Sequence, residues 1–300
     1  MLKDKYIDYL TFEKRYSAHT IIAYQSDLND FSRYILTQYN FTDLLQADHI
    51  FIRSWLISLL EQKITPRSVN RKLSTLKSFY RYCLKQGLLT VNPMLKVVAP
   101  RVSKPLPVFL TRDSLDTLLH EVVFEPGYEG CRDKMIVTLF YATGIRREEL
   151  VQIQLYDIDL EKGTLKVLGK RKKERIVPIG ESVIALLKDY ILERDIFFSE
   201  KMLTAQNNNS SLFVTSKGLP VYPRLIYNIV HKYLSLIAPN SQLSPHVLRH
   251  TFATHMLDDG ADLNAIKEIL GHSSLAATQV YTHNTIEKLK TIYKQAHPRA

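Results

Sequence analysis

Apolar side chains recur every three or four positions through the first hundred residues, which is typical of amphipathic helices. Ser17 can cap a first helix, and a second helix covers residues 50–60. A third helix begins near Thr65 with Pro66 at its first position, and Gly87 would end it. The apolar positions of the first and third helices are Ile21, Ile22, Tyr24, Leu28, Phe31, Val69, Leu73, Leu76, Phe79, Tyr80 and Leu84. These patterns predict an all-helical first domain.

Prolines mark a break after these helices. The short stretch that follows holds Pro93, Pro100, Pro105 and Pro107, together with Lys96, Arg101 and Lys104. Proline fixes φ and removes a backbone donor, so a continuous helix cannot cross this stretch. We therefore predict a helical domain over residues 1–100, a basic linker over 101–107 and a second domain over 108–300.

The second domain combines helical patterns with segments rich in β-branched residues. The predicted elements are a helix capped by Thr111, a helix over 132–143 that ends at Gly144, strands over 164–168 and 174–178 joined by a hairpin tip, and a third strand over 212–215. The remaining residues are mainly helical in pattern. The predicted fold class is therefore mainly α with two domains, the second of which holds a small antiparallel β-sheet.

The composition is that of an ordinary globular protein, with 45% hydrophobic and 23% charged residues. No apolar run approaches the roughly 20 residues that span a bilayer, and the charged start leads into no apolar signal core. Cys83 and Cys131 are the only cysteines, too few for a secreted disulfide framework and too far apart for a zinc pair. We therefore expect a cytoplasmic protein without membrane contact.

An excess of positive charge indicates an anionic partner, most commonly nucleic acid. The net charge is +10 and the isoelectric point about 9.4, and residues 1–100 carry 14 basic against 8 acidic residues. Many of these basic residues follow the helix that starts near Thr65. Among them, the candidates for contact with DNA phosphates or base edges are Arg67, Arg71, Lys72 and Lys77. A solvated helix face is the alternative interpretation.

A phosphate-binding helix start is predicted at residue 244. Ser244 can cap this helix and Pro245 suits its first position. His246, Arg249 and His250 then lie on one face. Free N–H groups and the helix dipole favour anions at this end, and a guanidinium can bind a phosphate through two hydrogen bonds. Taken alone, the segment is more typical of an ordinary surface helix.

Further candidates gain meaning only as a set. Arg146 follows a helix stop, Lys170 lies at the hairpin tip and His272 follows Gly271, with Tyr281 nine residues later. Each alone is more typical of a solvated turn, a surface lysine, a structural histidine or an ordinary tyrosine. The segments that hold the candidates read YATGIRREEL at 141–150, GKRKKERIVP at 169–178, SPHVLRHTFATHM at 244–256 and LGHSSLAATQVYTH at 270–283.

In this order, the four segments resemble the tyrosine recombinase (phage integrase) family, and within it the Xer recombinases that resolve chromosome dimers. The resemblance extends over nearly the whole chain. Residues 1–100 resemble the family's helical core-binding domain, and residues 297–300, HPRA, resemble the D-type Xer terminus. The family's two domains clamp a DNA duplex, and the resemblance implies the same for this chain.

The resemblance assigns the catalytic roles to Arg146, Lys170, His246, Arg249, His272 and Tyr281. Tyr281 would be the nucleophile that forms a covalent intermediate with DNA. The two arginines would hold the non-bridging phosphate oxygens, and Lys170 would protonate the departing 5′ oxygen. His246 would move the tyrosine proton, and His272 would bond the phosphate.

Two of these positions have competitors. The family often has Gly-Asn between its hairpin lysines, whereas Arg171 and Lys172 stand between Lys170 and Lys173. Lys172 and Lys173 therefore compete with Lys170 for the role of general acid. Arg147 likewise stands beside Arg146, so the two arginines need separate tests.

The implied chemistry needs no cofactor. A 3′-phosphotyrosine keeps the energy of the phosphodiester, and the sequence has neither a Walker-type phosphate loop nor the carboxylate cluster of a two-metal site. The implied partners are double-stranded DNA with a specific recombination site, a homo- or heterotetramer with a second recombinase, and a DNA translocase. The amphipathic tail, with Ile286, Leu289 and Ile292, would dock into a neighbouring protomer or pack on its own domain.

Other functions remain as alternatives. An integrase of a mobile element or a type IB topoisomerase would use similar chemistry. Helical patterning that starts almost at Met1, with no additional arm-binding domain before it, favours the Xer type. A non-catalytic DNA-binding protein is the alternative from a different class, and the presence of the whole catalytic set argues against it.

Overall fold

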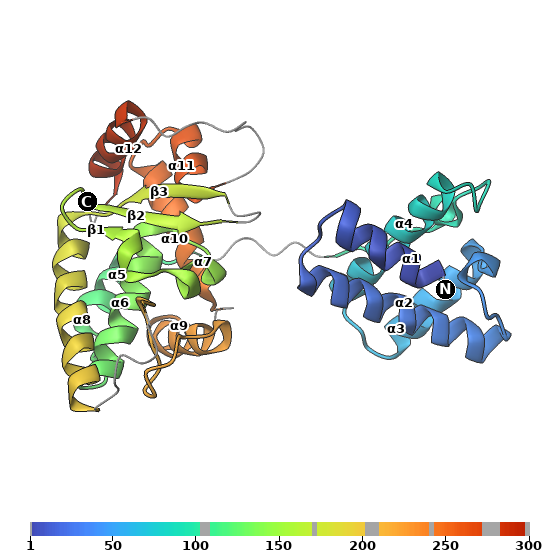
Figure 1. Cartoon of the computed structure of the whole chain (residues 1–300), viewed down its shortest axis with the longest axis horizontal. Helices are drawn as coiled ribbons and strands as arrows, with labels where there is room; N and C mark the ends of the chain where they lie inside the picture. Colours follow the sequence, from blue (N-terminus) through green and yellow to red (C-terminus); the bar gives the residue numbers. More distant parts are fainter. Residues whose placement is uncertain are drawn as a thin grey trace. The chain divides into compact units, whose positions relative to one another are not determined.

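The computed structural model describes residues 2–102, 109–169, 173–201, 210–239, 243–271 and 283–297. The chain divides into two compact units, Met1–Pro105 and Leu106–Ala300. Helices dominate both units, and a small antiparallel sheet lies in the second (Figure 1). The predicted fold class, mainly α with a small antiparallel sheet, is therefore confirmed. Within the described ranges, no helix is long and apolar enough to cross a membrane.

The first unit is a helical bundle with an aromatic core. Its elements are α1 (Leu2–Asp8), the π-helical turn η1 (Tyr9–Glu13), α2 (Ala18–Tyr39), η2 (Leu44–Gln46), α3 (His49–Glu61), α4 (Pro66–Lys85) and η3 (Pro93–Lys96). The side chains of Ser17 and Thr65 cap α2 and α4, as predicted from the sequence. In the core, the rings of Phe31 and Trp55 lie 4.8 Å apart between centroids.

A buried ion cluster connects α2 to α4. Asp27 of α2 has no exposed surface and accepts hydrogen bonds from Arg71, Lys72 and Thr75 of α4. The ammonium of Lys72 also donates to Asp30, at 2.7 Å. A carboxylate can be buried in this way only when charged and polar partners replace the water that it loses. The basic face of α4 is therefore partly internal.

The second unit surrounds one central helix. Its elements are α5 (Arg112–Asp116), η4 (Thr117–Glu121), α6 (Tyr128–Thr143), α7 (Arg147–Gln152), η5 (Leu155–Asp157), β1 (Ile158–Asp159), β2 (Thr164–Leu168), β3 (Glu174–Pro178), α8 (Glu181–Glu200), α9 (Pro223–Ile237), α10 (Pro245–Asp258), α11 (Leu263–Leu270) and α12 (His283–Ala296). Helix α6 is buried almost all round because α8, α9 and α10 pack against it. Helices α11 and α12 lie beside β3 (Figure 1).

The predicted hairpin is present, but the predicted third strand is wrong. Strands β2 and β3 have the predicted bounds and pair antiparallel, with Leu168 opposite Glu174. The third strand is β1, which pairs with β2, and residues 212–215 form no strand. Side chains bind two of their carbonyls: Tyr190 donates to that of Leu212, and Tyr128 and Arg132 donate to that of Val214. Backbone N–H groups of the following turn bind the other two. The apolar run at 212–215 therefore reflects burial in the core.

The start of one helix and the cap of another differ from the sequence prediction. Helix α6 begins at Tyr128, four residues before the predicted start, after Gly127 at φ +81°. Helix α10 begins at Pro245 as expected, but the side chain of Ser244 makes no capping hydrogen bond. The opening of α10 therefore depends on proline and on packing, since Pro245 itself is buried.

The C-terminal helix packs on its own unit in this single chain. Leu289, Tyr293 and Ala296 are buried in the core of the second unit, and the ring of His297 stacks on that of Tyr293 at 4.8 Å. The side chain of Ile286 lies outside the described residues. Of the two arrangements that the sequence left open, the structure of the isolated chain has the internal one.

Candidate active site

Two of the predicted catalytic residues lie on the first turns of α10. Arg249 is buried, at 9% exposure, and its guanidinium donates to the carbonyls of Gly144 and Leu270. Burial and the nearby charge of Arg146 lower the pKa of Arg249 to about 10. His246, one turn earlier, is exposed. The N-terminal part of α10 thus carries a buried cation, the Arg249 guanidinium, which a bound anion would stabilise.

Arg146 sits at the start of α7, where the chain turns after α6. Gly144 ends α6 in the left-handed conformation, at φ +58°, and Arg146 takes the extended N-cap position of α7. Its guanidinium donates to Glu149 at 2.7 Å and to the carbonyl of Gly271 at 3.1 Å. The carboxylate of Glu149 also accepts from the backbone N–H of Arg146, which fixes the arginine at the helix start.

A third arginine, which the sequence analysis did not single out, completes the cluster. Arg175 of β3 is buried and binds both carboxylate oxygens of Glu149, at 2.9 and 2.8 Å. Burial raises the pKa of Glu149, but the hydrogen bonds and charges of Arg175 and Arg146 outweigh it and lower that pKa to about 2. Glu149 is therefore a carboxylate at neutral pH, shared between two guanidinium groups.

The arginines converge on the end of α11. Its last carbonyls have no partner within the helix and carry the negative end of the helix dipole. Arg175 donates to the carbonyl of Ile269, Arg249 to that of Leu270 and Arg146 to that of Gly271. Together with one carboxylate, the three guanidinium groups leave an excess of positive charge beside residue 271. Such a site is suited to bind a phosphate diester and to stabilise negative charge on it.

Three predicted catalytic residues lie outside the described residues: Lys170, His272 and Tyr281. The competing candidates are partly visible. Arg147 pairs with Glu148 at 2.6 Å and does not join the arginine cluster. Lys173 is exposed, and its carbonyl accepts from the N–H of Gly169 to close the hairpin. Arg146 is therefore the arginine of this pair that the fold brings to Arg249.

The structure separates the predicted DNA-binding residues of α4. Arg67, Arg71 and Lys77 are exposed, whereas Lys72 is 8% exposed and bound to Asp27 and Asp30. Direct contact of Lys72 with a phosphate would compete with these two ion pairs, and contact of Arg71 would compete with its own bonds to Asp27. The hydrophobic positions of α4 did not reveal this, because the partner acids lie on α2.

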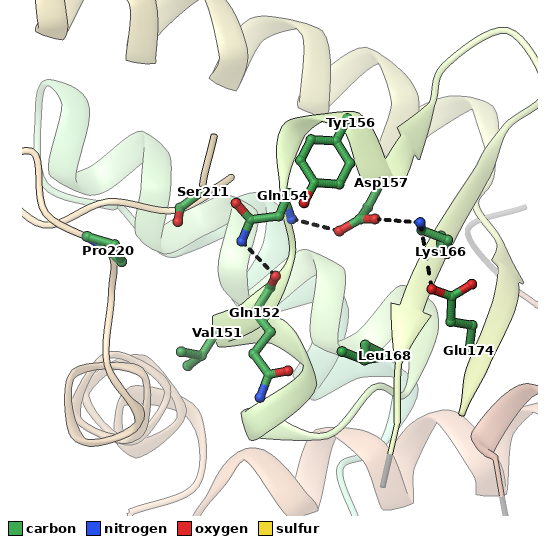
Figure 2. A pocket seen from close by; sticks show the side chains of 10 residues that line it. All are labelled: Val151, Gln152, Gln154, Tyr156, Asp157, Lys166, Leu168, Glu174, Ser211 and Pro220. Atoms are coloured by element: carbon green, nitrogen blue, oxygen red, sulfur yellow. Dashed lines mark hydrogen bonds and ion pairs between the residues drawn. The ribbon is translucent and has the colours of Figure 1, made fainter. Parts of the chain in front are cut away.

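A hollow of about 470 Å³ lies beside strands β2 and β3 (Figure 2). Its walls are Val151, Gln152, Gln154, Tyr156, Asp157, Lys166, Leu168, Glu174, Ser211 and Pro220. Figure 2 shows Lys166 between Asp157 and Glu174, with ion-pair distances of 3.4 and 3.9 Å. Arg146, His246 and Arg249, the predicted catalytic residues that the structure describes, do not line it. Among the described residues, no cluster of histidine, cysteine or acidic side chains could hold a metal ion.

Comparison with known proteins covers both units. Residues 108–288 match the model of the phage integrase family, and residues 4–87 match the phage integrase N-terminal SAM-like domain. Tyrosine recombinase XerC of Oceanobacillus iheyensis is 38% identical over 298 residues, covering 99% of this chain and 96% of that protein. Tyrosine recombinase XerC of Staphylococcus saprophyticus is 37% identical over 299 residues, covering 100% and 98%. Both relatives are named XerC, whereas residues 297–300 resemble the D-type terminus.

Solved structures share the fold. The XerH site-specific recombinase in a post-cleavage complex with palindromic difH DNA matches with a TM-score of 0.69 at 22% identity, covering 93% of this chain and 77% of that one. The Tn1549 transposon integrase in complex with transposon right end DNA matches with a TM-score of 0.71 at 17% identity, covering 97% and 94%. At these identities the likeness concerns the fold.

Proposed function

Since the chain belongs to the phage integrase family and is a Xer-type site-specific DNA recombinase, we propose that it cuts and rejoins DNA through a 3′-phosphotyrosine on Tyr281. The observation that carries this proposal is the convergence of Arg146 and Arg249 on the end of α11, where they donate to the carbonyls of Gly271 and Leu270. The chain from there leads directly to His272 and Tyr281. The cationic site and the nucleophile are thus neighbours along the chain.

The arginines act on the charge of the phosphate. A guanidinium has five N–H donors, and the bonds to Gly144 and Leu270 use two of those of Arg249. The others can bind the non-bridging oxygens, on which negative charge increases as the tyrosine oxygen attacks phosphorus. Because the cluster already excludes water from Arg249, its charge acts at short range and without reorganisation.

The proposed cleavage step exchanges one phosphate ester for another. The hydroxyl oxygen of Tyr281 bonds to phosphorus, and the bond from phosphorus to the 5′ oxygen breaks. His246 takes the tyrosine proton and Lys170 supplies a proton to the 5′ oxygen, while His272 bonds the phosphate. Reversal with another 5′ hydroxyl rejoins a strand. The ester energy is retained, so the step needs neither metal nor nucleotide.

The biological role that we propose is resolution of chromosome dimers at cell division, in the cytoplasm. The support is the similarity over the full chain to relatives named XerC. The proposed partners are double-stranded DNA with a specific recombination site, a second recombinase in a homo- or heterotetramer, and a DNA translocase. The proposed DNA contacts of the first unit are Arg67, Arg71, Lys72 and Lys77 on α4, of which all but Lys72 are exposed.

A nicked suicide substrate tests the chemistry. Wild-type protein, Tyr281→Phe and Tyr156→Phe are each mixed with nicked duplexes that carry candidate dimer-resolution sites, in chelator and without nucleotide. A covalent protein–DNA adduct on a denaturing gel is expected from wild type and from Tyr156→Phe, whose tyrosine is exposed and outside the cluster. Tyr281→Phe should form none. An adduct from Tyr281→Phe, or none from wild type on any site with or without a second recombinase, would overturn the proposal.

A further inference from the structure

Arg175 lies where three segments of the candidate active site meet. It is 5% exposed, although it belongs to a short hairpin whose tip carries Lys170. Its fork of donors binds both oxygens of Glu149 and, through Nε at 2.7 Å, the carbonyl of Ile269. One side chain thereby connects β3, α7 and the end of α11. A buried guanidinium with all of these partners is typical of a residue that fixes geometry.

We propose that Arg175 is a positioning residue for the cleavage step: it holds Glu149 against Arg146 and keeps the end of α11 beside the arginine pair. The inference deepens the proposed function and depends on it. Arg175 does not touch DNA in this proposal. It acts through Arg146, whose side chain and backbone N–H are both bound by the carboxylate that Arg175 holds.

Two glycines support this assignment because each precedes a proposed catalytic residue. A Cβ on Gly271, before His272, would lie 3.1 Å from Cδ of Arg175. A Cβ on Gly169, before Lys170, would lie 3.5 Å from Oε1 of Glu149 and 3.6 Å from Nη1 of Arg175. The backbone on both sides therefore approaches the Arg175–Glu149 pair closely. The same pair can thus set the starting points of the segments that carry His272 and Lys170.

The geometry of the guanidinium explains why lysine cannot replace it. Arginine presents several N–H donors in a planar fork, whereas lysine presents a single ammonium on a flexible stem. Arg175→Lys keeps the positive charge but cannot bind both oxygens of Glu149 and the Ile269 carbonyl at once. Arg146 would then be held less firmly. Misplacement of a catalytic group by about 1 Å can slow a reaction by roughly 100-fold.

The test is a double-mutant cycle on the rate of adduct formation with a saturating suicide substrate. Wild type, Arg175→Lys, Arg146→Lys and the double variant are compared. If Arg175 acts through Arg146, Arg175→Lys slows cleavage by roughly 100-fold. The double variant is then no more than about 3-fold slower than the slower single variant, because residues that act as a unit are not additive. The DNA affinity of Arg175→Lys should change by less than about 3-fold. A variant that fails to fold would lose DNA binding as well.

Arg194→Lys is the matched control. Arg194 is also 5% exposed and donates to a backbone carbonyl, that of Ser211, but it belongs to α8 and contacts none of the cluster. It should cleave at the wild-type rate. If Arg175→Lys fails to fold by circular dichroism, Glu149→Gln takes its place in the cycle, since it keeps the side-chain volume.

The outcomes separate this inference from the function on which it depends. Wild-type rate in Arg175→Lys, or effects of Arg175→Lys and Arg146→Lys that multiply in the double variant, would overturn the positioning role and leave the recombinase chemistry intact. No adduct from wild type would overturn both. A slow Arg175→Lys, a double variant that is no slower than the slower single variant and a wild-type rate for Arg194→Lys would support the positioning role.

Discussion

Replacing Asp27 by alanine should destabilise the first unit by about 3 kcal/mol. The carboxylate is fully buried and accepts four hydrogen bonds, from Arg71, Lys72 and Thr75. Removing one partner of a buried ion pair costs about 3–5 kcal/mol. The lower end of this range applies for two reasons. Lys72 keeps its ion pair with Asp30, and the Arg71 side chain is 49% exposed, so water can replace part of its lost hydrogen bonding.

Trp55 makes the measurement specific to this unit. It is the only tryptophan, it is buried beside Phe31, and the ammonium of Lys72 lies 5.9 Å from its ring centroid. Its fluorescence in urea therefore reports the unfolding of the first unit alone. Without such a probe, the unfolding transitions of the two units would be difficult to separate. With a slope of about 1.5 kcal/mol per molar urea, a loss of about 3 kcal/mol moves the midpoint down by about 2 M.

Asp30→Ala is the control. Asp30 binds the same lysine, but its side chain is 38% exposed, and exposed ion pairs contribute only about 0–1 kcal/mol. Its midpoint should move by less than about 0.7 M. Equal midpoints for the two variants would refute the structural role of the Asp27 cluster.

Further predictions concern the DNA contact, the carboxylate and the glycine turns. Lys77→Ala should make the negative slope of log affinity against log salt less steep by about 1, without changing the Trp55 urea midpoint. An unchanged slope would contradict the phosphate contact. The pKa of Glu149 falls from 4.5 to about 2 on folding, so its charge stabilises the folded state above pH 4.5 and this contribution is lost as the pH falls towards 2. Above about pH 5, the melting temperature of Glu149→Gln should therefore be lower than that of wild type by a constant amount, and the difference should shrink as the pH falls. A difference that stays constant down to low pH would argue against an ionised carboxylate. Gly144→Ala should lower the melting temperature and the cleavage rate more than Gly87→Ala, because both have positive φ but only the first places a Cβ 2.6 Å from Phe252. Equal effects of Gly144→Ala and Gly87→Ala would show that Phe252 moves away from the new Cβ at no cost in stability.

Local elements followed from local chemistry. The caps at Ser17 and Thr65 and the bounds of β2 and β3 depend on residues within a few positions of each other, and the sequence predicted them. The prediction of a strand at 212–215 was wrong because apolar residues indicate burial but do not indicate which groups bind the backbone. In the fold, tyrosine and arginine side chains from α6 and α8 bind two of its carbonyls, and backbone N–H groups bind the other two.

The functional residues divide in the same way. The family motifs identified Arg146 and Arg249, and the fold brings both to one place. The motif at 169–178 also contains Arg175, and the motif at 141–150 contains Glu149, but the sequence assigned no role to either residue. The signal that was available was the i, i+3 spacing of Arg146 and Glu149 at a helix start.

By itself, the sequence determined the helical periods, the caps, the hairpin and the order of the family motifs, because each depends on neighbours along the chain. Only the tertiary structure decided which charges are buried and what they bind. Arg175 meets Glu149 across 26 residues and Ile269 across 94, and Arg146 meets Gly271 across 125. Lys72 meets Asp27 across 45. The residue type does not determine whether a charged side chain faces water or a buried carboxylate. That difference arises only when folding removes the water between distant segments.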